Sequence, residues 1–532
     1  MFRVQCAAQS WWVLAFSLAL GLGGATMAGE GADTQTAPRQ LRAAGHHLRI
    51  DLMWRAEDAQ CFEIWRADRA TGPFQLIRER HFLSVFTDFI GRDGITHHYR
   101  VRPVAAGEAT LPFSETVAGT SQAEDDEAFL TGVQEAGIRY FYDFAHPISG
   151  LAREWGYNDA RPHARTICAT GATGMGMLNL VVGLERGVLP AKETKALVLK
   201  MLRFLGEDTE RFDGAFSHWM DGNSGKALPF AKIGGADIVE TAFLMQGILV
   251  LREYFTDGDA VSREIRQRAD ALWRAVEWDK FADPRQRLYW HWPVPEGKHG
   301  MRITGSNEGH LPYLLAVASP SHPAPPEVYH SGWVGTHQVL NKRYYDVPLE
   351  VGRPHGFPLF WTHYSYLGFD PRGIRDRHVA DYFEHHRRVA RIHYLYALDN
   401  PKKFKGYGAE CWGLTSSSGP KGYGGWTPVR HDNGTIAPTA ALSSMPYAPV
   451  EALAMLKGLY RDQGAELWRE FGFMDALNPT ENWVSPLWIG IDVGPIAPMI
   501  ENHRTGLCWR LFMQAPEVRK AIRTLGIQRG ER

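Results

Sequence analysis

Two patterns of apolar residues divide the chain. From residue 46 to residue 120, apolar and polar side chains alternate in short runs, as in Leu48–Trp54, Phe62–Ile64, Phe74–Leu76 and Tyr99–Val101. Turn residues such as those at 70–73 separate the runs. Alternation with a period of two places one face of each strand in a core, so this region is predicted to be an all-β sandwich.

After Ser121 the apolar residues recur at steps of three and four, which is the period of a helix with one buried face. The segments with this pattern are 125–144, 172–186, 190–206, 237–255, 261–278, 307–318, 378–398, 435–460, 462–473 and 496–512. Because strand signals are few, residues 121–532 are predicted to form one mainly α domain. Long loops rich in glycine and aromatic residues alternate with the helices, and this favours an (α/α)6 toroid of helical hairpins whose loops build a cleft at one end.

The N-terminal residues have the features of an export signal. Arg3 precedes a short apolar run at 11–20, and small residues at 26–28 provide a cleavage site. We therefore expect residues 1–28 to be a signal peptide, residues 29–45 to be a linker, and the mature protein to be periplasmic or secreted. An uncleaved N-terminal anchor is the alternative.

Composition excludes several classes of protein. The 532 residues carry 58 Lys and Arg against 59 Asp and Glu, a net charge of -1 that does not favour a nucleic-acid partner. No HExxH or CxxC motif predicts a metal site, so we expect no metal or organic cofactor, and we expect a monomer. The cysteines downstream of the signal are predicted to be buried free thiols, with one disulfide left open: Cys61, Cys168, Cys411 and Cys508.

The loops combine carboxylates with aromatic residues, and the chain holds 18 tryptophans. Indole rings stack on sugar rings, while carboxylates and amides bind hydroxyl groups, so the composition points to a carbohydrate ligand. The predicted sugar-binding residues are His146, Arg153, His218, Trp219, Glu308, Tyr364, Glu410, Trp412, Asn433 and Glu481. For Glu308 and Glu481 helix capping is the competing interpretation, and for Glu410 and Trp412 it is ordinary turn chemistry.

Three carboxylates are candidates for catalysis. Glycoside hydrolysis needs one protonated carboxyl and one carboxylate, and an apolar pocket keeps the acid protonated. Glu240 lies in such a sequence, although its spacing from Asp237 equally fits a capping box. Glu154 follows Arg153, where a surface ion pair is the simpler account. Asp143 ends a predicted helix, where a carboxylate is unfavourable unless His146 or Arg153 compensates it.

Four stretches, 140–154, 239–247, 363–373 and 432–440, resemble the bacterial glucoamylase-like domain, which includes the endo-β-1,2-glucanases of glycoside hydrolase family 144. The likeness extends over about residues 125–515. It implies an (α/α)6 barrel without cofactor that hydrolyses β-1,2-glucan with inversion. It also implies that Asp143, Glu154 and Glu240 lie nearest the chemistry, with His146, Glu410 and Trp412 lining the sugar site; it does not assign acid and base. Residues 46–120 resemble a fibronectin type III module.

Two positions depart from the family pattern. Ser418 stands where the resemblance leads us to expect Asp, and Ser306 stands where it leads us to expect Trp. These departures keep a second hypothesis open, a catalytically weak glycan-binding protein on the same barrel. An exo-acting or transglycosylating relative is a further alternative, and a polysaccharide lyase ranks below both because the visible motifs are mostly acidic.

Overall fold

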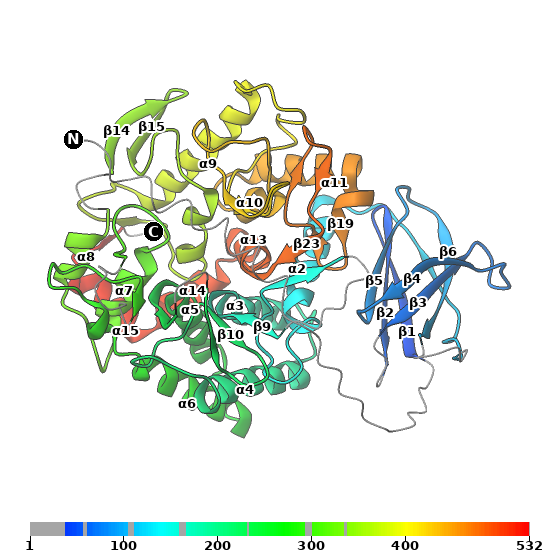
Figure 1. Cartoon of the computed structure of the whole chain (residues 1–532), viewed down its shortest axis with the longest axis horizontal. Helices are drawn as coiled ribbons and strands as arrows, with labels where there is room; N and C mark the ends of the chain where they lie inside the picture. Colours follow the sequence, from blue (N-terminus) through cyan, green and yellow to red (C-terminus); the bar gives the residue numbers. More distant parts are fainter. Residues whose placement is uncertain are drawn as a thin grey trace.

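The computed structural model describes residues 38–56, 61–104, 111–158, 166–230, 234–292, 301–334 and 338–530. The predicted signal peptide and the first part of the predicted linker, 29–37, lie outside these ranges. Figure 1 shows a β-rich part beside a larger helical part. Among the described helices, none is both long and apolar enough to cross a membrane.

The β-rich part is built from two antiparallel sheets, with strand orders β1-β2-β5 and β4-β3-β6-β7. The strands are β1 Arg39–His46, β2 Arg49–Arg55, β3 Phe62–Ala67, β4 Gln75–His81, β5 Val85–Phe89, β6 Thr96–Pro103 and β7 Val117–Thr120. The alternating runs at 48–54, 62–64 and 99–101 lie in strands as predicted. The linker prediction was wrong over 39–45, because β1 pairs there with β2 and supplies the edge of the first sheet.

Alternate side chains of the two sheets meet in a small core of their own. Its buried members are Ile50, Leu52, Trp54, Phe62, Ile64, Phe86, Tyr99 and Val101. The larger core of the chain is assembled almost entirely from residues after 128. Each part therefore has its own hydrophobic centre.

The helical part follows the predicted segments with shifts of a few residues at their ends. Its α-helices are α2 Asp126–Tyr142, α3 Thr170–Glu185, α4 Ala191–Glu207, α5 Ile238–Tyr254, α6 Ala260–Ala275, α7 His310–Ala318, α8 Glu327–Gly332, α9 Tyr382–Asp399, α10 Pro438–Ser443, α11 Pro449–Leu467, α12 Gly490–Val493, α13 Ile496–Arg504, α14 Leu507–Gln514 and α15 Pro516–Thr524. The predicted helices 435–460 and 496–512 are each two helices, because Pro449 begins a new helix in the first and Gly506, with φ of 68°, interrupts the second. The predicted helix 462–473 was wrong: α11 ends at Leu467, and the chain turns into the strands β19 Trp468–Arg469 and β20 Gly472–Phe473.

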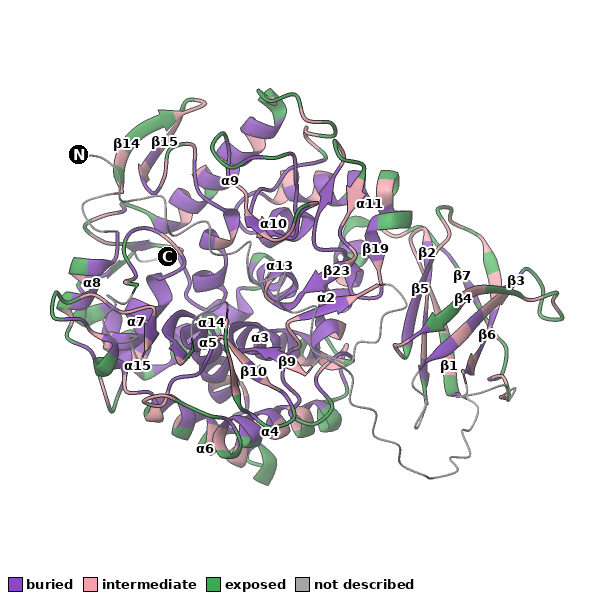
Figure 2. Ribbon diagram, viewed as in Figure 1, coloured by how far each residue is buried: buried purple, intermediate pink, exposed green. Residues whose placement is uncertain are grey.

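The two helices that position the candidate site are in direct backbone contact. A Cβ atom at Gly174 of α3 would lie 2.1 Å from the carbonyl oxygen of Phe243 in α5, and one at Gly247 of α5 would lie 2.2 Å from the carbonyl oxygen of Gly174. Only glycine permits this approach. Figure 2 shows both helices buried except at their C-terminal ends, whereas α4 and α6 expose one face.

Arg49 joins the β-sandwich to the helical part. Its guanidinium donates to the Tyr460 hydroxyl of α11 at 2.9 Å and to Asp51 at 3.0 Å, and it lies 4.8 Å from the ring centroid of Trp468. The ring of Phe89 lies against Gly464, where an added Cβ would come within 2.4 Å of it. The four cysteines Cys61, Cys168, Cys411 and Cys508 are buried and free, as predicted.

Candidate active site

Glu240 lies in the first turn of α5 with its carboxyl group turned toward α3. Its Oε2 accepts a hydrogen bond of 2.7 Å from the backbone N–H of Gly171, and a Cβ at position 171 would lie 2.4 Å from that oxygen. The side chain is buried, and burial raises the pKa of Glu240 to about 7. Asp237 caps the helix through the N–H groups of residues 239 and 240, while Glu240 makes no return bond to it. The capping-box interpretation of Glu240 was therefore wrong.

His218 faces Glu240 from the start of β10, Trp219–Asp221. Its Nδ1 lies 2.9 Å from Asp237 Oδ2 and 4.0 Å from Glu240 Oε1, and its ring stacks on Phe230 with 3.8 Å between centroids. Burial alone would lower the pKa of His218, but the charge of Glu240 and the bond to Asp237 raise it to about 9. His218 is therefore a cation at neutral pH, and its hydrogen bond to Asp237 holds the pKa of that carboxyl low against the effect of burial.

The buried Glu308 and the half-buried Glu154 complete what we call the carboxyl cluster: Glu154, Asp237, Glu240 and Glu308 around His218. Burial raises the pKa of Glu154 to about 6 and that of Glu308 to about 7. The charge of Glu154 acts on Glu240, and the charges of Asp237 and Glu240 act on Glu308. The structure thus brings together Glu154, Glu240, His218 and Glu308, which the sequence placed in one site from distant segments.

A second pair of buried carboxyls lies beside Glu154. Asp475 stands between β20 and β21, Leu477–Asn478, and Asp492 lies in α12. The hydroxyl of Tyr364, a predicted site residue, donates to Asp492 Oδ1 at 2.8 Å. Sequence reasoning gave Asp475 no role, although a carboxylate between Met474 and Ala476 in an apolar run was a signal, since such groups are seldom buried without a reason.

The structure places three predicted residues elsewhere. Asp143 lies at the exposed end of α2, where Arg139 Nη1 pairs with it at 3.0 Å. Glu410 is exposed and pairs with Arg461 at 2.9 Å. Trp412 is fully buried, and its indole N–H donates to the carbonyl of Glu451. The expectations that Asp143 is catalytic and that Glu410 and Trp412 line the sugar site were wrong for this geometry.

The other predicted residues fall into two groups. Trp219 lies beside Glu154 and contacts the rings of Trp155 and Phe230, at 5.8 and 5.0 Å between centroids. The remaining four have local structural contacts. His146 is buried with Nδ1 3.2 Å from the Ser149 hydroxyl, Arg153 donates to the carbonyl of Phe144, Asn433 accepts from the N–H of Thr435, and Glu481 is exposed in the turn that Asn478 stabilises.

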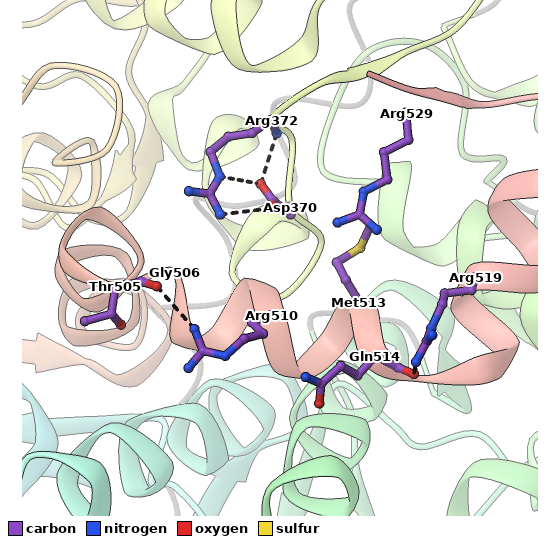
Figure 3. A pocket seen from close by; sticks show the side chains of 9 residues that line it. All are labelled: Asp370, Arg372, Thr505, Gly506, Arg510, Met513, Gln514, Arg519 and Arg529. Atoms are coloured by element: carbon purple, nitrogen blue, oxygen red, sulfur yellow. Dashed lines mark hydrogen bonds and ion pairs between the residues drawn. The ribbon is translucent and has the colours of Figure 1, made fainter. Parts of the chain in front are cut away.

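Two surface cavities in the described part of the chain do not coincide with the carboxyl cluster. One of about 350 Å³ lies along α14 and is lined by arginines at positions 372, 510, 519 and 529 (Figure 3). Asp370 is paired there with Arg372. The other, of about 470 Å³, lies on α4 around Lys200 and Phe204. The carboxyl cluster itself therefore defines the chemistry of the site.

A helical domain that buries several protonatable carboxyls beside aromatic rings is the arrangement of a glycoside hydrolase, and the comparisons agree. The chain is 38% identical over 516 residues to an exo β-1,2-glucooligosaccharide sophorohydrolase of Parabacteroides distasonis, covering 92% of this chain and 71% of the relative. A crystal structure of a β-1,2-glucanase from that organism matches with a TM-score of 0.86 at 38% identity, over 93% of this chain and 74% of the other.

An endo-β-1,2-glucanase from Chitinophaga pinensis, solved with sophorotriose and glucose, matches at 40% identity and a TM-score of 0.73, over 76% of this chain and 99% of its own. The Glycoamylase family, described as "Putative glucoamylase", matches residues 300–516. The chain belongs to this glucoamylase-like family of glycoside hydrolases, which is related to glycoside hydrolase family 144.

Proposed function

We propose that the protein hydrolyses β-1,2-linked glucans, that Glu240 is the proton donor, and that the helices form the (α/α)6 toroid expected from the sequence. The observation that carries the proposal is the environment of Glu240. It is a buried carboxyl with a pKa of about 7, held at one end by the Gly171 N–H, within a chain similar over 92% of its length to a sophorohydrolase. Such a group is protonated for half its population at neutral pH, as a general acid must be.

The neighbours of Glu240 support this role. Burial raises the pKa of Glu240, and the charges of Asp237 and Glu154 add to this effect, which favours the protonated donor. Asp237 holds His218 in place, and the His218 cation next to the donor stabilises the carboxylate that Glu240 becomes after it has given up its proton. Glu308 and Trp219 are placed to bind sugar hydroxyls and a sugar face. In an inverting reaction a second carboxylate activates water from the opposite side of the ring.

We further propose that the enzyme is exo-acting and releases disaccharide, because the sophorohydrolase shares the β-sandwich region as well as the helical part of this chain. Linear β-1,2-glucan is the test substrate. A product that is disaccharide from the first minutes supports this mode, whereas an early ladder of longer oligosaccharides supports endo cleavage. We also propose that the protein is periplasmic or secreted, which cell fractionation tests.

The role of Glu240 is tested by Glu240→Gln. We expect kcat on the glucan to fall at least ~100-fold, since general acid catalysis contributes about 10² to 10⁴. In the wild type, kcat is expected to fall as pH rises through about 7, because Glu240 then loses its proton. Retention of wild-type turnover by Glu240→Gln would refute the assignment.

A further inference from the structure

Asp475 and Asp492 are two buried carboxyls that the proposed acid chemistry does not use. Asp475 is 0% exposed and Asp492 is 4% exposed. Neither forms an ion pair with any Lys, Arg or His of the described residues. Burying a carboxylate without a cation is costly, so a pair kept in this state requires another explanation.

Their hydrogen bonds show how the pair is protonated. Asp475 Oδ2 accepts two bonds from Ser418, one from its N–H at 2.6 Å and one from its hydroxyl at 2.5 Å. The two carboxyls bond to each other, and within the described residues Asp475 Oδ1 and Asp492 Oδ2 have no other donor. A bond between two carboxyls requires one proton. Burial raises the pKa of both carboxyls, and the charge of Asp475 raises that of Asp492 further. The two bonds that Ser418 donates favour the carboxylate form at Asp475, so we assign the shared proton to Asp492.

The pair belongs to the same site as Glu240. Gly490, which begins α12 two residues before Asp492, donates its N–H to the Glu154 carbonyl at 2.8 Å, and the charge of Glu154 acts on both Glu240 and Asp492. Tyr364, which donates to Asp492, also contacts Phe243 of α5, one turn beyond Glu240, with 5.7 Å between ring centroids. The pair and the proton donor therefore both adjoin Glu154 and Tyr364, and an inverting reaction requires its acid and its base in one such site.

Ser418 contacts the Asp475 carboxylate on the side away from Asp492 and supplies it with a hydroxyl. Its hydroxyl lies 2.5 Å from Asp475 Oδ2 and 2.9 Å from the hydroxyl of Ser485, and the residue is 6% exposed. A hydroxyl that donates to a carboxylate keeps a lone pair that can accept a proton from water. The Ser418 hydroxyl can therefore pass a proton between a water molecule and Asp475.

We propose, on the basis of the function proposed above, that Asp475 is the base of the reaction and that the Ser418 hydroxyl passes to it the proton of the attacking water. The water oxygen bonds to the anomeric carbon as the glycosidic C–O bond breaks. The water proton moves to Ser418 Oγ, whose own proton moves to Asp475 Oδ2, while Glu240 protonates the leaving oxygen. Asp475 ends neutral and Glu240 ends ionised, so charge and protons balance. Asp492 is a positioning residue that holds Asp475 Oδ1.

The test compares Asp475→Asn, Ser418→Ala, Asp492→Asn and Glu240→Gln on linear β-1,2-glucan and on 2,4-dinitrophenyl β-sophoroside. The aryl leaving group needs no protonation, so loss of the acid spares this substrate and loss of the base does not. We expect Asp475→Asn and Ser418→Ala to lower kcat at least ~100-fold on both substrates. We expect Glu240→Gln to lose activity on the glucan alone.

Asp492→Asn is the matched control, because an amide N–H can replace the proton donated to Asp475. It is expected to lower kcat less than ~10-fold, and to keep the acidic limb of the pH profile that Asp475→Asn abolishes. Ser418→Ala is expected to fold like the wild type, because the backbone N–H of residue 418 can still donate to Asp475. A loss of activity in this variant then reports the loss of the hydroxyl. The assignment of Asp475 and Ser418 is overturned if Ser418→Ala keeps activity within twofold of wild type, or if Asp475→Asn keeps its activity on the aryl sophoroside. Either result leaves the proposed function standing. A wild type that hydrolyses neither substrate overturns the proposed function and the assignment with it.

Discussion

The contact between α3 and α5 can be tested by replacing Gly174 with alanine. The new Cβ would lie 2.1 Å from the Phe243 carbonyl oxygen and 2.5 Å from the Leu244 Cα, well inside the 3.4 Å at which ordinary contact begins. Both obstacles are backbone atoms, so the two helices have to separate. Overpacking of a core costs about 1 to 3 kcal/mol, and alanine returns up to ~1 kcal/mol of helix propensity. We expect a net loss of about 2 kcal/mol.

The assay is urea-induced unfolding followed by tryptophan fluorescence, with activity measured in parallel. Activity is expected to fall more steeply than stability, because α5 carries Glu240 and a displacement of 1 Å in a catalytic group can cost ~100-fold in rate. Gly206→Ala is the control: this position lies in the last turn of α4 with no atom within 4 Å of an added Cβ, and alanine there should stabilise by roughly 0.5 to 1 kcal/mol. A Gly174→Ala protein as stable as the wild type would refute the backbone contact.

Three further predictions concern stability and the site boundary. Burial lowers the pKa of five histidines, His310, His363, His385, His386 and His393. The unfolded chain therefore binds more protons than the folded chain below pH 6.5, and stability is expected to fall as pH drops from 6.5 toward 4. His386→Leu should reduce this dependence by about 1.4 kcal/mol per pH unit in urea titrations between pH 5 and 4, and an unchanged slope would contradict the prediction. Arg49→Met removes the buried guanidinium and its bonds to Asp51 and Tyr460, and is expected to cost about 2 kcal/mol. The loss should appear as faster proteolysis between the sandwich and α2, and equal cleavage rates would count against it. Glu410→Gln is expected to keep kcat within twofold, because Glu410 is exposed and paired with Arg461. A large loss of kcat would show that Glu410 belongs to the active site.

Much of the architecture could be predicted because periodicity reports burial directly. The runs at 48–54 and 99–101 alternate since one face of each strand enters the sandwich core, and they lie in β2 and β6. The helix predicted over 462–473 failed because Phe471 and Phe473 continue an apolar spacing after the backbone has left α11. Side-chain spacing alone does not reveal where a chain reverses.

The site was predicted in part, and the errors follow from what local sequence lacks. Glu240 stands in an apolar sequence and is buried in the fold, whereas Glu154 follows Arg153 and only the fold brings it to the carboxyl cluster. Asp143 has Arg139 one turn earlier, and this i, i+4 pair draws it to the surface. The proposed role of Asp475 depends on its contacts with Ser418 and Asp492, which lie in other segments of the chain. The sequence around Asp475 therefore could not show the pair.

The contact that Arg49 makes between the β-sandwich and the helical part limits how the protein can be truncated for expression. Tyr460 and Trp468 lie against Arg49, and the ring of Phe129 lies 4.7 Å from that of Tyr460. Removing the residues before α2 would expose these aromatic side chains and leave an apolar, aggregation-prone patch on the helical part. A shortened version would need polar replacements at this patch before its solubility could be compared fairly with that of the full-length enzyme.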